Sequence, residues 1–123
     1  MSEEISKLPP QVQQRLLRLQ QLQQTLQGVL TQKQQLELEL TEVEQAVDEV
    51  KKLTDNATIY KSIGSLLVKS ERGKVTTDLN ERKELLDMRI NVLGKHEERL
   101  RSQVKELQTK LQRDLRPLSP PPS

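Results

Sequence analysis

Apolar residues recur in alternating steps of three and four along most of the chain, which predicts two long helices. The first series has ten apolar residues in twelve positions between Val12 and Val50, and the second has eight in ten between Leu79 and Leu111. A strict repeat of 3.5 residues is typical of the narrow contact stripe of a coiled coil, here called the seam. The two seams are Val12, Arg15, Leu19, Leu22, Leu26, Val29, Lys33, Leu36, Leu40, Val43, Val47 and Val50, and then Leu79, Lys83, Leu86, Ile90, Leu93, Glu97, Leu100, Val104, Leu107 and Leu111.

The predicted helices have different boundary signals. Pro9-Pro10 marks the start of the first, because proline is tolerated in the first turn of a helix, and this helix should end near residue 52. The second helix is expected to begin between residues 71 and 78 and to end near Arg113. Asp78 and Glu81 have the spacing of a capping box, which places one possible start at Asp78.

Residues 58–69 interrupt the helical pattern with bulky and β-branched residues divided by Gly64-Ser65. A Gly-X loop fits a type II′ turn, because glycine accepts a positive φ at the first central position. We therefore expect a β-hairpin here, although an irregular loop at the bend of a helical hairpin is an alternative. The expected cross-strand pairs are Ile63 with Leu66, Ser62 with Leu67, and Lys61 with Val68.

The short connection requires the two helices to run antiparallel and to pack along their seams. If the Gly64-Ser65 turn lies on the axis, facing residues should lie equally far from it along the chain. This register brings Lys33 opposite Glu97, so that the basic and the acidic interruptions of the two seams meet.

The predicted hairpin needs partners from other chains. Two short strands without a covering layer are marginally stable in water, and their outer edges carry unpaired backbone groups. Nothing else in the sequence has the pattern of a strand, so the chain is expected to be a subunit of an assembly. The residues expected to form the contacts are Ile59, Tyr60, Ile63, Leu66, Leu67 and Val68.

Composition agrees with a coiled-coil protein of mainly α class. The chain has 123 residues, of which 33% are hydrophobic and 31% charged, and Tyr60 is its single aromatic residue. It has no cysteine, no apolar run near the roughly 18 residues of a membrane span, and no signal-peptide pattern at its start. We expect a cytoplasmic protein with one domain at residues 10–114, a flexible lead at 1–9 and a disordered proline-rich tail at 115–123.

The sequence offers no catalytic constellation. His96 is the sole histidine and has no nucleophile to serve, and the carboxylates alternate with Lys and Arg at helical spacing. Neither a glycine-rich phosphate loop nor a metal-ligand spacing is present. We therefore expect no enzyme activity, cofactor or metal.

The free ends of the two helices are basic and rich in leucine. From Arg99 onward the sequence contains six basic residues and two acidic ones, and the register places Arg15 and Arg18 beside this segment. Without an aromatic platform or a groove-reading motif, this charge favours an acidic protein surface over nucleic acid. The leucines are either ordinary seam residues at a fraying end or a surface that holds apolar segments of another chain.

Several segments together resemble the prefoldin family, in the form of the archaeal beta subunits. They are Leu8-Pro-Pro-Gln-Val-Gln13, Lys33-Gln-Gln-Leu-Glu-Leu-Glu-Leu40, Tyr60-Lys-Ser-Ile-Gly-Ser-Leu-Leu-Val-Lys69, Glu81-Arg-Lys-Glu-Leu-Leu86 and His96-Glu-Glu-Arg-Leu100. The resemblance covers about residues 8–112, and its most specific part is the Tyr60–Lys69 hairpin between two long helices. The chain departs from the family pattern at Gly73 and in the proline-rich tail.

This resemblance implies an ATP-independent chaperone, a holdase, that binds non-native proteins and hands them to a group II chaperonin. It implies a hexamer of two alpha and four beta subunits in which the hairpins join into a β-barrel. The implied client-binding residues are Val12, Leu16, Leu19, Leu107, Leu111 and Leu115, and the implied chaperonin-docking residues are Lys110, Arg113 and Arg116. The alternatives are a structural coiled-coil spacer or tether without client binding and, less favoured, a nucleic-acid-binding protein.

Overall fold

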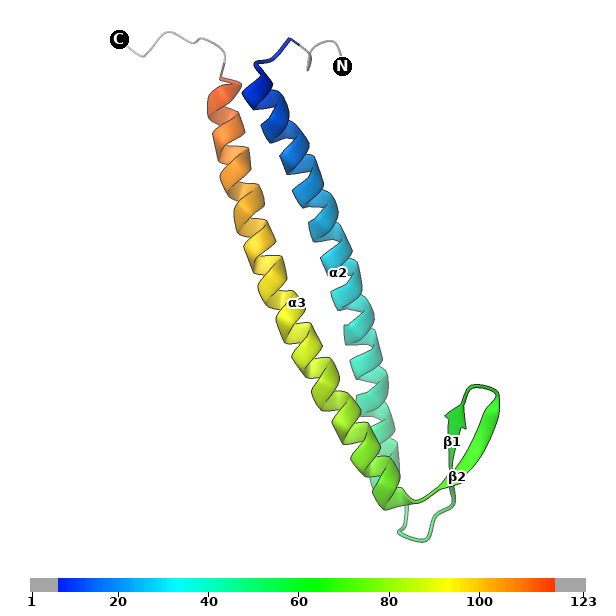
Figure 1. The fold of residues 1–123 in the computed structure, drawn as a ribbon. Coiled ribbons are helices and arrows are strands. Elements are labelled where there is room, and N and C mark those ends of the chain that lie inside the picture. The colour runs from blue at the N-terminus through cyan, green and yellow to red at the C-terminus, as the bar shows by residue number, and fades with distance from the viewer. Residues whose placement is uncertain (1–6, 117–123) are drawn as a thin grey trace. The chain divides into compact units, whose positions relative to one another are not determined.

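The structure, a computed structural model, describes residues 7–116. Helix α2 (Pro10–Lys51) is followed by strands β1 (Ile59–Ile63) and β2 (Leu66–Ser70) and by helix α3 (Arg72–Asp114), as Figure 1 shows. The predicted fold class, two long helices with a small antiparallel hairpin between them, is confirmed. Most of the expected lead at 1–9 and of the expected tail at 115–123 lies outside the described residues.

Both helices end where backbone chemistry favours it. Pro10 opens α2, and the carbonyl of Pro9 accepts hydrogen bonds from the amides of Val12 and Gln13 at 2.9 and 3.1 Å. Lys51 and Arg113 lie in the last turns of α2 and α3, where a cation complements the negative end of the helix dipole. The predicted helix ends are therefore correct to within one residue.

The start of α3 lies at Arg72, near the beginning of the range expected from the sequence. The capping box at Asp78 and Glu81 is wrong, because both residues lie well inside the helix. The amide of Val75 already donates to the carbonyl of Glu71 at 2.9 Å, so regular helical hydrogen bonding begins before Asp78 is reached. Asp78 instead forms an ion pair with Lys61 of β1 at 3.3 Å.

The hairpin has the predicted register. Ile63 faces Leu66, Ser62 faces Leu67 and Lys61 faces Val68, and the antiparallel pairing extends to Ile59 and Ser70. Gly64 has a φ of 59°, and none of the described residues other than glycine has a positive φ. A type I′ turn needs a positive φ at both central residues, so the turn is of the predicted Gly-first II′ kind.

The chain divides into two compact units. The central unit consists of Gln32–Leu93, and the terminal unit consists of the residues up to Thr31 and from Gly94 onward. Every apolar residue that is buried in the described part of the chain lies on one of the predicted seams. These are Val43, Val50 and Leu86 in the central unit, and Val12, Leu22, Val29, Leu100 and Leu111 in the terminal unit.

Ion pairs between the helices report the register within each unit. In the terminal unit Arg15 pairs with Asp114, and the two residues are equally far along the chain from the turn, as expected. In the central unit Glu39 pairs with Arg82, which is closer to the turn than its partner is. The offset at this pair has the same direction as the inequality of the nearby connections, residues 52–58 between α2 and β1 and Glu71 alone between β2 and α3. Lys33 and Glu97 belong to different units, and their proximity stays a prediction.

Candidate functional site

The terminal unit brings four of the six predicted client-binding leucine and valine positions into one groove. Leu16 and Leu19 of α2 and Leu111 and Leu115 of α3 line an open groove of about 640 Å³. Leu115 is 45% exposed and Leu111 only 4%, so Leu111 forms the floor and Leu115 the rim. Gln108, Gln112 and Arg116 complete the lining, and sequence reasoning missed the two glutamines. Gln108 and Gln112 lie seven and three residues before Leu115, so they share its face of α3, and this spacing was the signal available in the sequence.

The other two predicted residues lie elsewhere in the terminal unit. Leu107 lines a second, smaller groove together with Leu22 and Lys110. Val12 is 6% exposed and lines neither groove, and its contact with a client stays a prediction. Four of the six predicted client-binding residues therefore share one groove, and the other two, Leu107 and Val12, lie outside it.

Basic and apolar residues are interleaved in the terminal unit. Arg116 lines the leucine groove, and Lys110 lines the second groove while forming an ion pair with Glu106 at 3.5 Å. Arg113 is exposed. A polypeptide that occupies the leucine groove thus meets the positive charge of Arg116 as well as apolar side chains.

The hairpin presents an apolar surface on a sheet of two strands. The exposed fractions of Tyr60, Ile63, Leu66 and Leu67 are 60%, 53%, 66% and 72%, and that of Val68 is 44%. Ile59 is half-buried. Exposed apolar clusters of this kind, beside unpaired strand edges, mark contact sites for other chains.

Two side chains of the central unit, Lys61 and Arg72, make contacts that the sequence did not suggest. Lys61 of β1 reaches Asp78 of α3 at 3.3 Å. Arg72 donates hydrogen bonds to the carbonyls of Val50 and Lys51 at 3.2 and 3.4 Å, and to the Asp55 carboxylate at 2.6 Å. The same guanidinium therefore holds the end of α2, the connection to β1 and the start of α3.

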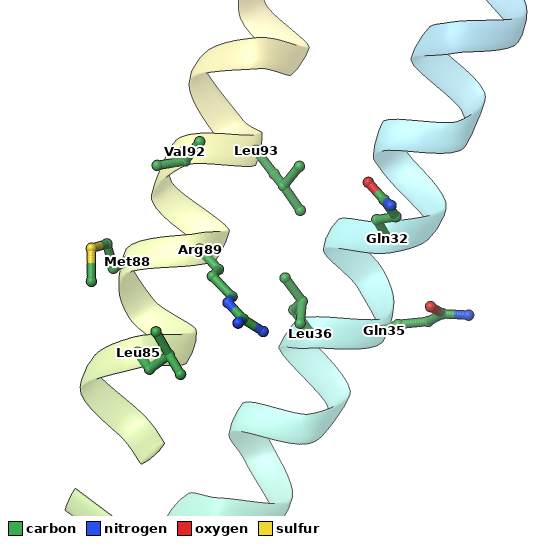
Figure 2. A pocket seen from close by; sticks show the side chains of 8 residues that line it. All are labelled: Gln32, Gln35, Leu36, Leu85, Met88, Arg89, Val92 and Leu93. Carbon is green, nitrogen blue, oxygen red and sulfur yellow. The ribbon is translucent and has the colours of Figure 1, made fainter. Parts of the chain in front are cut away.

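The central unit has a groove of its own, of about 610 Å³, between α2 and α3. Sequence reasoning missed it, although Met88 and Val92 are apolar, lie four residues apart and stand beside the seam. The residues that line it, shown in Figure 2, are Gln32, Gln35, Leu36, Leu85, Met88, Arg89, Val92 and Leu93.

Residues 7–116 contain no cluster of three or more His, Cys, Asp or Glu side chains arranged to hold a metal ion. Within the same range, neither α2 nor α3 has a stretch that is long and apolar enough to cross a membrane. What the described residues offer is apolar grooves and an exposed sheet.

An antiparallel pair of helices that carries an exposed hairpin and open apolar grooves defines a coiled-coil assembly subunit with surfaces for other polypeptides. A family model for prefoldin subunits matches residues 13–116, so the chain belongs to the prefoldin family. The fold and the identity thus agree with the resemblance seen in the sequence.

Archaeal prefoldin beta subunits are similar to the chain over nearly its full length. The protein of Thermococcus kodakarensis is 44% identical over 110 residues, which cover 89% of this chain and 94% of the relative. That of Archaeoglobus fulgidus is 45% identical over 113 residues, covering 92% and 97%. The crystal structure of the prefoldin beta subunit from Thermococcus strain KS-1 superposes with a TM-score of 0.83 at 44% identity, over 90% of this chain and 97% of that one.

Prefoldin is a family of chaperones and not of enzymes, and its members assemble with other prefoldin subunits. The known function of the family is to bind client polypeptides and deliver them to a chaperonin. Family membership therefore supports the chaperone role expected from the sequence over the role of a passive spacer.

Proposed function

We propose that this chain is an ATP-independent holdase subunit that binds non-native polypeptides at the free ends of its helices and delivers them to a group II chaperonin. The observation that carries the proposal is the groove formed by Leu16, Leu19, Leu111 and Leu115 in the terminal unit of a prefoldin-family chain. The subunit has no catalytic role, needs no cofactor and acts in the cytoplasm.

The hairpins of several subunits join in a β-barrel, within a hexamer of two alpha and four beta subunits. The exposed apolar side chains of β1 and β2 and the sheet of only two strands support this arrangement. Burial of these side chains against other hairpins would supply the apolar contacts that the single chain lacks. The prefoldin-like domain, residues 10–114, supplies the hairpin and most of the leucine groove, and Leu115 and Arg116 directly after it complete the groove.

Client binding is tested by charging the accessible part of the leucine groove with Leu16→Glu and Leu115→Glu. Leu111 is left intact because it is nearly buried and its replacement would disturb helix packing. The doubly substituted assembly should no longer suppress the aggregation of guanidine-denatured citrate synthase, as followed by light scattering. The control is Leu17→Glu with Gln21→Glu, which adds the same charge at exposed positions outside the groove.

Two results would contradict this assignment. If the groove variant assembles and protects the enzyme as well as the unsubstituted protein does, the leucine groove is not the client site. If the unsubstituted assembly gives no protection at all, the chain acts as a spacer or tether.

Chaperonin delivery is tested through Lys110, Arg113 and Arg116, which we propose as the docking residues. Replacing all three with Glu should weaken transfer of a bound client to a group II chaperonin, because opposite charges steer and hold such contacts. Transfer by the unsubstituted protein should also fall as salt is raised. The control replaces Lys52, Lys74 and Lys95 with Glu, which makes the same change of net charge at exposed positions outside the proposed docking residues. Unchanged transfer in both variants would refute the assignment.

A further inference from the structure

We propose that the groove in the central unit is a second client-contact site, separate from the leucine groove, and that it takes short apolar segments that carry a carboxylate. This inference rests on the proposed holdase function and specifies one of its surfaces. All of the residues involved belong to the central unit, Gln32–Leu93.

The groove has an apolar floor and an accessible margin. Figure 2 shows Leu36 of α2 and Leu93 of α3 pointing into the space between the two helices, with Arg89 extending toward Leu36. Met88 and Val92 project from the outer side of α3 and Gln35 from the outer side of α2, and all three line the groove at its margin. A chain segment laid along this space would touch both helices.

The apolar side chains at the margin of the groove are far more exposed than those that pack between the two helices. Leu86 on the seam is fully buried, whereas Met88 and Val92 are 60% and 59% exposed. Together with the half-buried Leu85, they widen the apolar stripe of α3 beyond a seam for one neighbour. A wide apolar stripe is the pattern of a helix that packs against a further element.

The polar residues of the groove define what this element can be. Gln32 and Gln35 each offer a donor and an acceptor to the backbone of a bound segment. Arg89 supplies the single charge among the lining residues, and no carboxylate accompanies it in the groove. Charge complementarity therefore favours an occupant that places Glu or Asp beside its apolar residues.

The size of the groove favours a transient occupant. Stable protein interfaces bury about 800 Å² on each partner and involve 20–30 residues a side, whereas eight residues line this groove. Met88 adds a flexible, polarizable side chain of the kind found on surfaces that accept many sequences. A weak and adaptable contact of this type fits a client segment better than a permanent subunit interface.

The test uses the assembled protein and two synthetic peptides with leucines at the same helical positions, one carrying Glu and the other Lys at the remaining positions. Because the chain has no cysteine, Gln35→Cys introduces a unique site for an environment-sensitive fluorophore at the margin of the groove. The Glu peptide should bind at least about fivefold more tightly than the Lys peptide, and Arg89→Glu should reverse this preference.

A second variant tests the apolar part of the groove. Met88→Gln with Val92→Gln should weaken binding of the Glu peptide about tenfold, since two apolar contacts are lost. The matched control is Leu38→Gln with Leu53→Gln, two exposed leucines of the central unit that do not line the groove, and it should leave the affinity unchanged. Circular dichroism establishes that each variant is folded.

Three results would overturn the inference while leaving the holdase function intact. The first is equal affinity of the unsubstituted protein for both peptides. The second is an affinity that does not change in the Met88/Val92 variant. The third is a fluorophore already shielded by assembly before any peptide is added, which would mean that a neighbouring subunit covers the groove. Failure of the holdase function itself is recognised separately, because the unsubstituted assembly would then not suppress client aggregation.

Discussion

The guanidinium of Arg72 donates a hydrogen bond from Nε to the backbone carbonyl of Val50 at 3.2 Å, so the first residue of α3 caps the last turn of α2. The final carbonyls of a helix have no partner within the helix and need one from outside. Arg72 donates to the carbonyl of Lys51 and adds a second donor to that of Val50, which also accepts from the amide of Leu53 at 3.1 Å, and it pairs with Asp55 as well.

Arg72→Met should therefore lower the free energy of unfolding by about 1.5–3 kcal/mol, the range for hydrogen bonds made by a charged group. The loss is measured by urea denaturation at a fixed subunit concentration, because assembly also contributes to stability. Lys52→Met is the control: its ion pair with Glu49 joins two exposed side chains, and its removal should change stability by less than about 0.5 kcal/mol. Equal losses in both variants would contradict a capping role for Arg72.

Leu86 is the one large side chain among the described residues that is wholly excluded from solvent. Leu86→Ala should cost about 2–5 kcal/mol, because it removes buried apolar atoms and leaves a cavity between the helices. Leu38→Ala makes the same chemical change at a position that is 62% exposed, and it should cost less than about 1 kcal/mol. Thermal unfolding followed by circular dichroism gives both values.

The glycines of the helices and of the turn should respond to alanine in opposite directions. A Cβ at Gly28 or Gly94 would meet nothing within 4 Å, so each replacement should raise stability by up to about 1 kcal/mol. Gly64 has a positive φ of 59°, and Gly64→Ala should cost about 1–2 kcal/mol at the turn. A stabilising effect of Gly64→Ala would show that the turn differs from the one described.

Charging the hairpin should abolish assembly without unfolding the helices. Ile63 and Leu67 are 53% and 72% exposed in the single chain and do not face each other across the strands, so Ile63→Glu with Leu67→Glu costs little within it. Size-exclusion chromatography with light scattering should show loss of the assembly, and circular dichroism should show that helix content is kept. The control, Leu17→Glu with Leu38→Glu, charges exposed leucines of α2 and should leave assembly intact.

Local rules in the sequence were sufficient for the hairpin and the seams. The Gly64-Ser65 pair determined the register because only glycine adopts a positive φ without strain, and every cross-strand partner followed from it. The 3.5-residue repeat identified the buried side chains, since a helix pair this narrow can bury only the residues that face the partner.

The start of α3 and the contacts around it depended on tertiary structure. Gly73 and Thr76-Thr77 have weak helix propensity, so nothing local marked Arg72 as the first residue. Extending the seam backward from Leu79 by four and then three residues reaches Val75 and Arg72, which was the signal available. That Arg72 would serve the carbonyls of another helix could not be read from its neighbours in sequence.

The grooves were only partly predicted, because helical spacing shows which side chains share a face of the helix and does not show how deeply each one is buried. Leu16 and Leu111 were both expected at the client surface, yet Leu111 is buried and Leu16 is half-buried. Whether an apolar side chain fills the seam or remains accessible depends on the size and stagger of the side chains opposite, which pattern analysis does not supply.

The connections from the two helices to the hairpin differ in length, so the helices differ in how directly they transmit force to the strands. Seven residues, 52–58, link α2 to the sheet, while Glu71 is the sole link between the sheet and α3. A pull on α3 is therefore transmitted directly to β2, whereas a pull on α2 reaches β1 only through residues 52–58 and through the contacts of Arg72 with Val50, Lys51 and Asp55. If a polypeptide bound in the proposed leucine groove pulls on both helices, α3 is expected to carry more of the force into the sheet than α2 does.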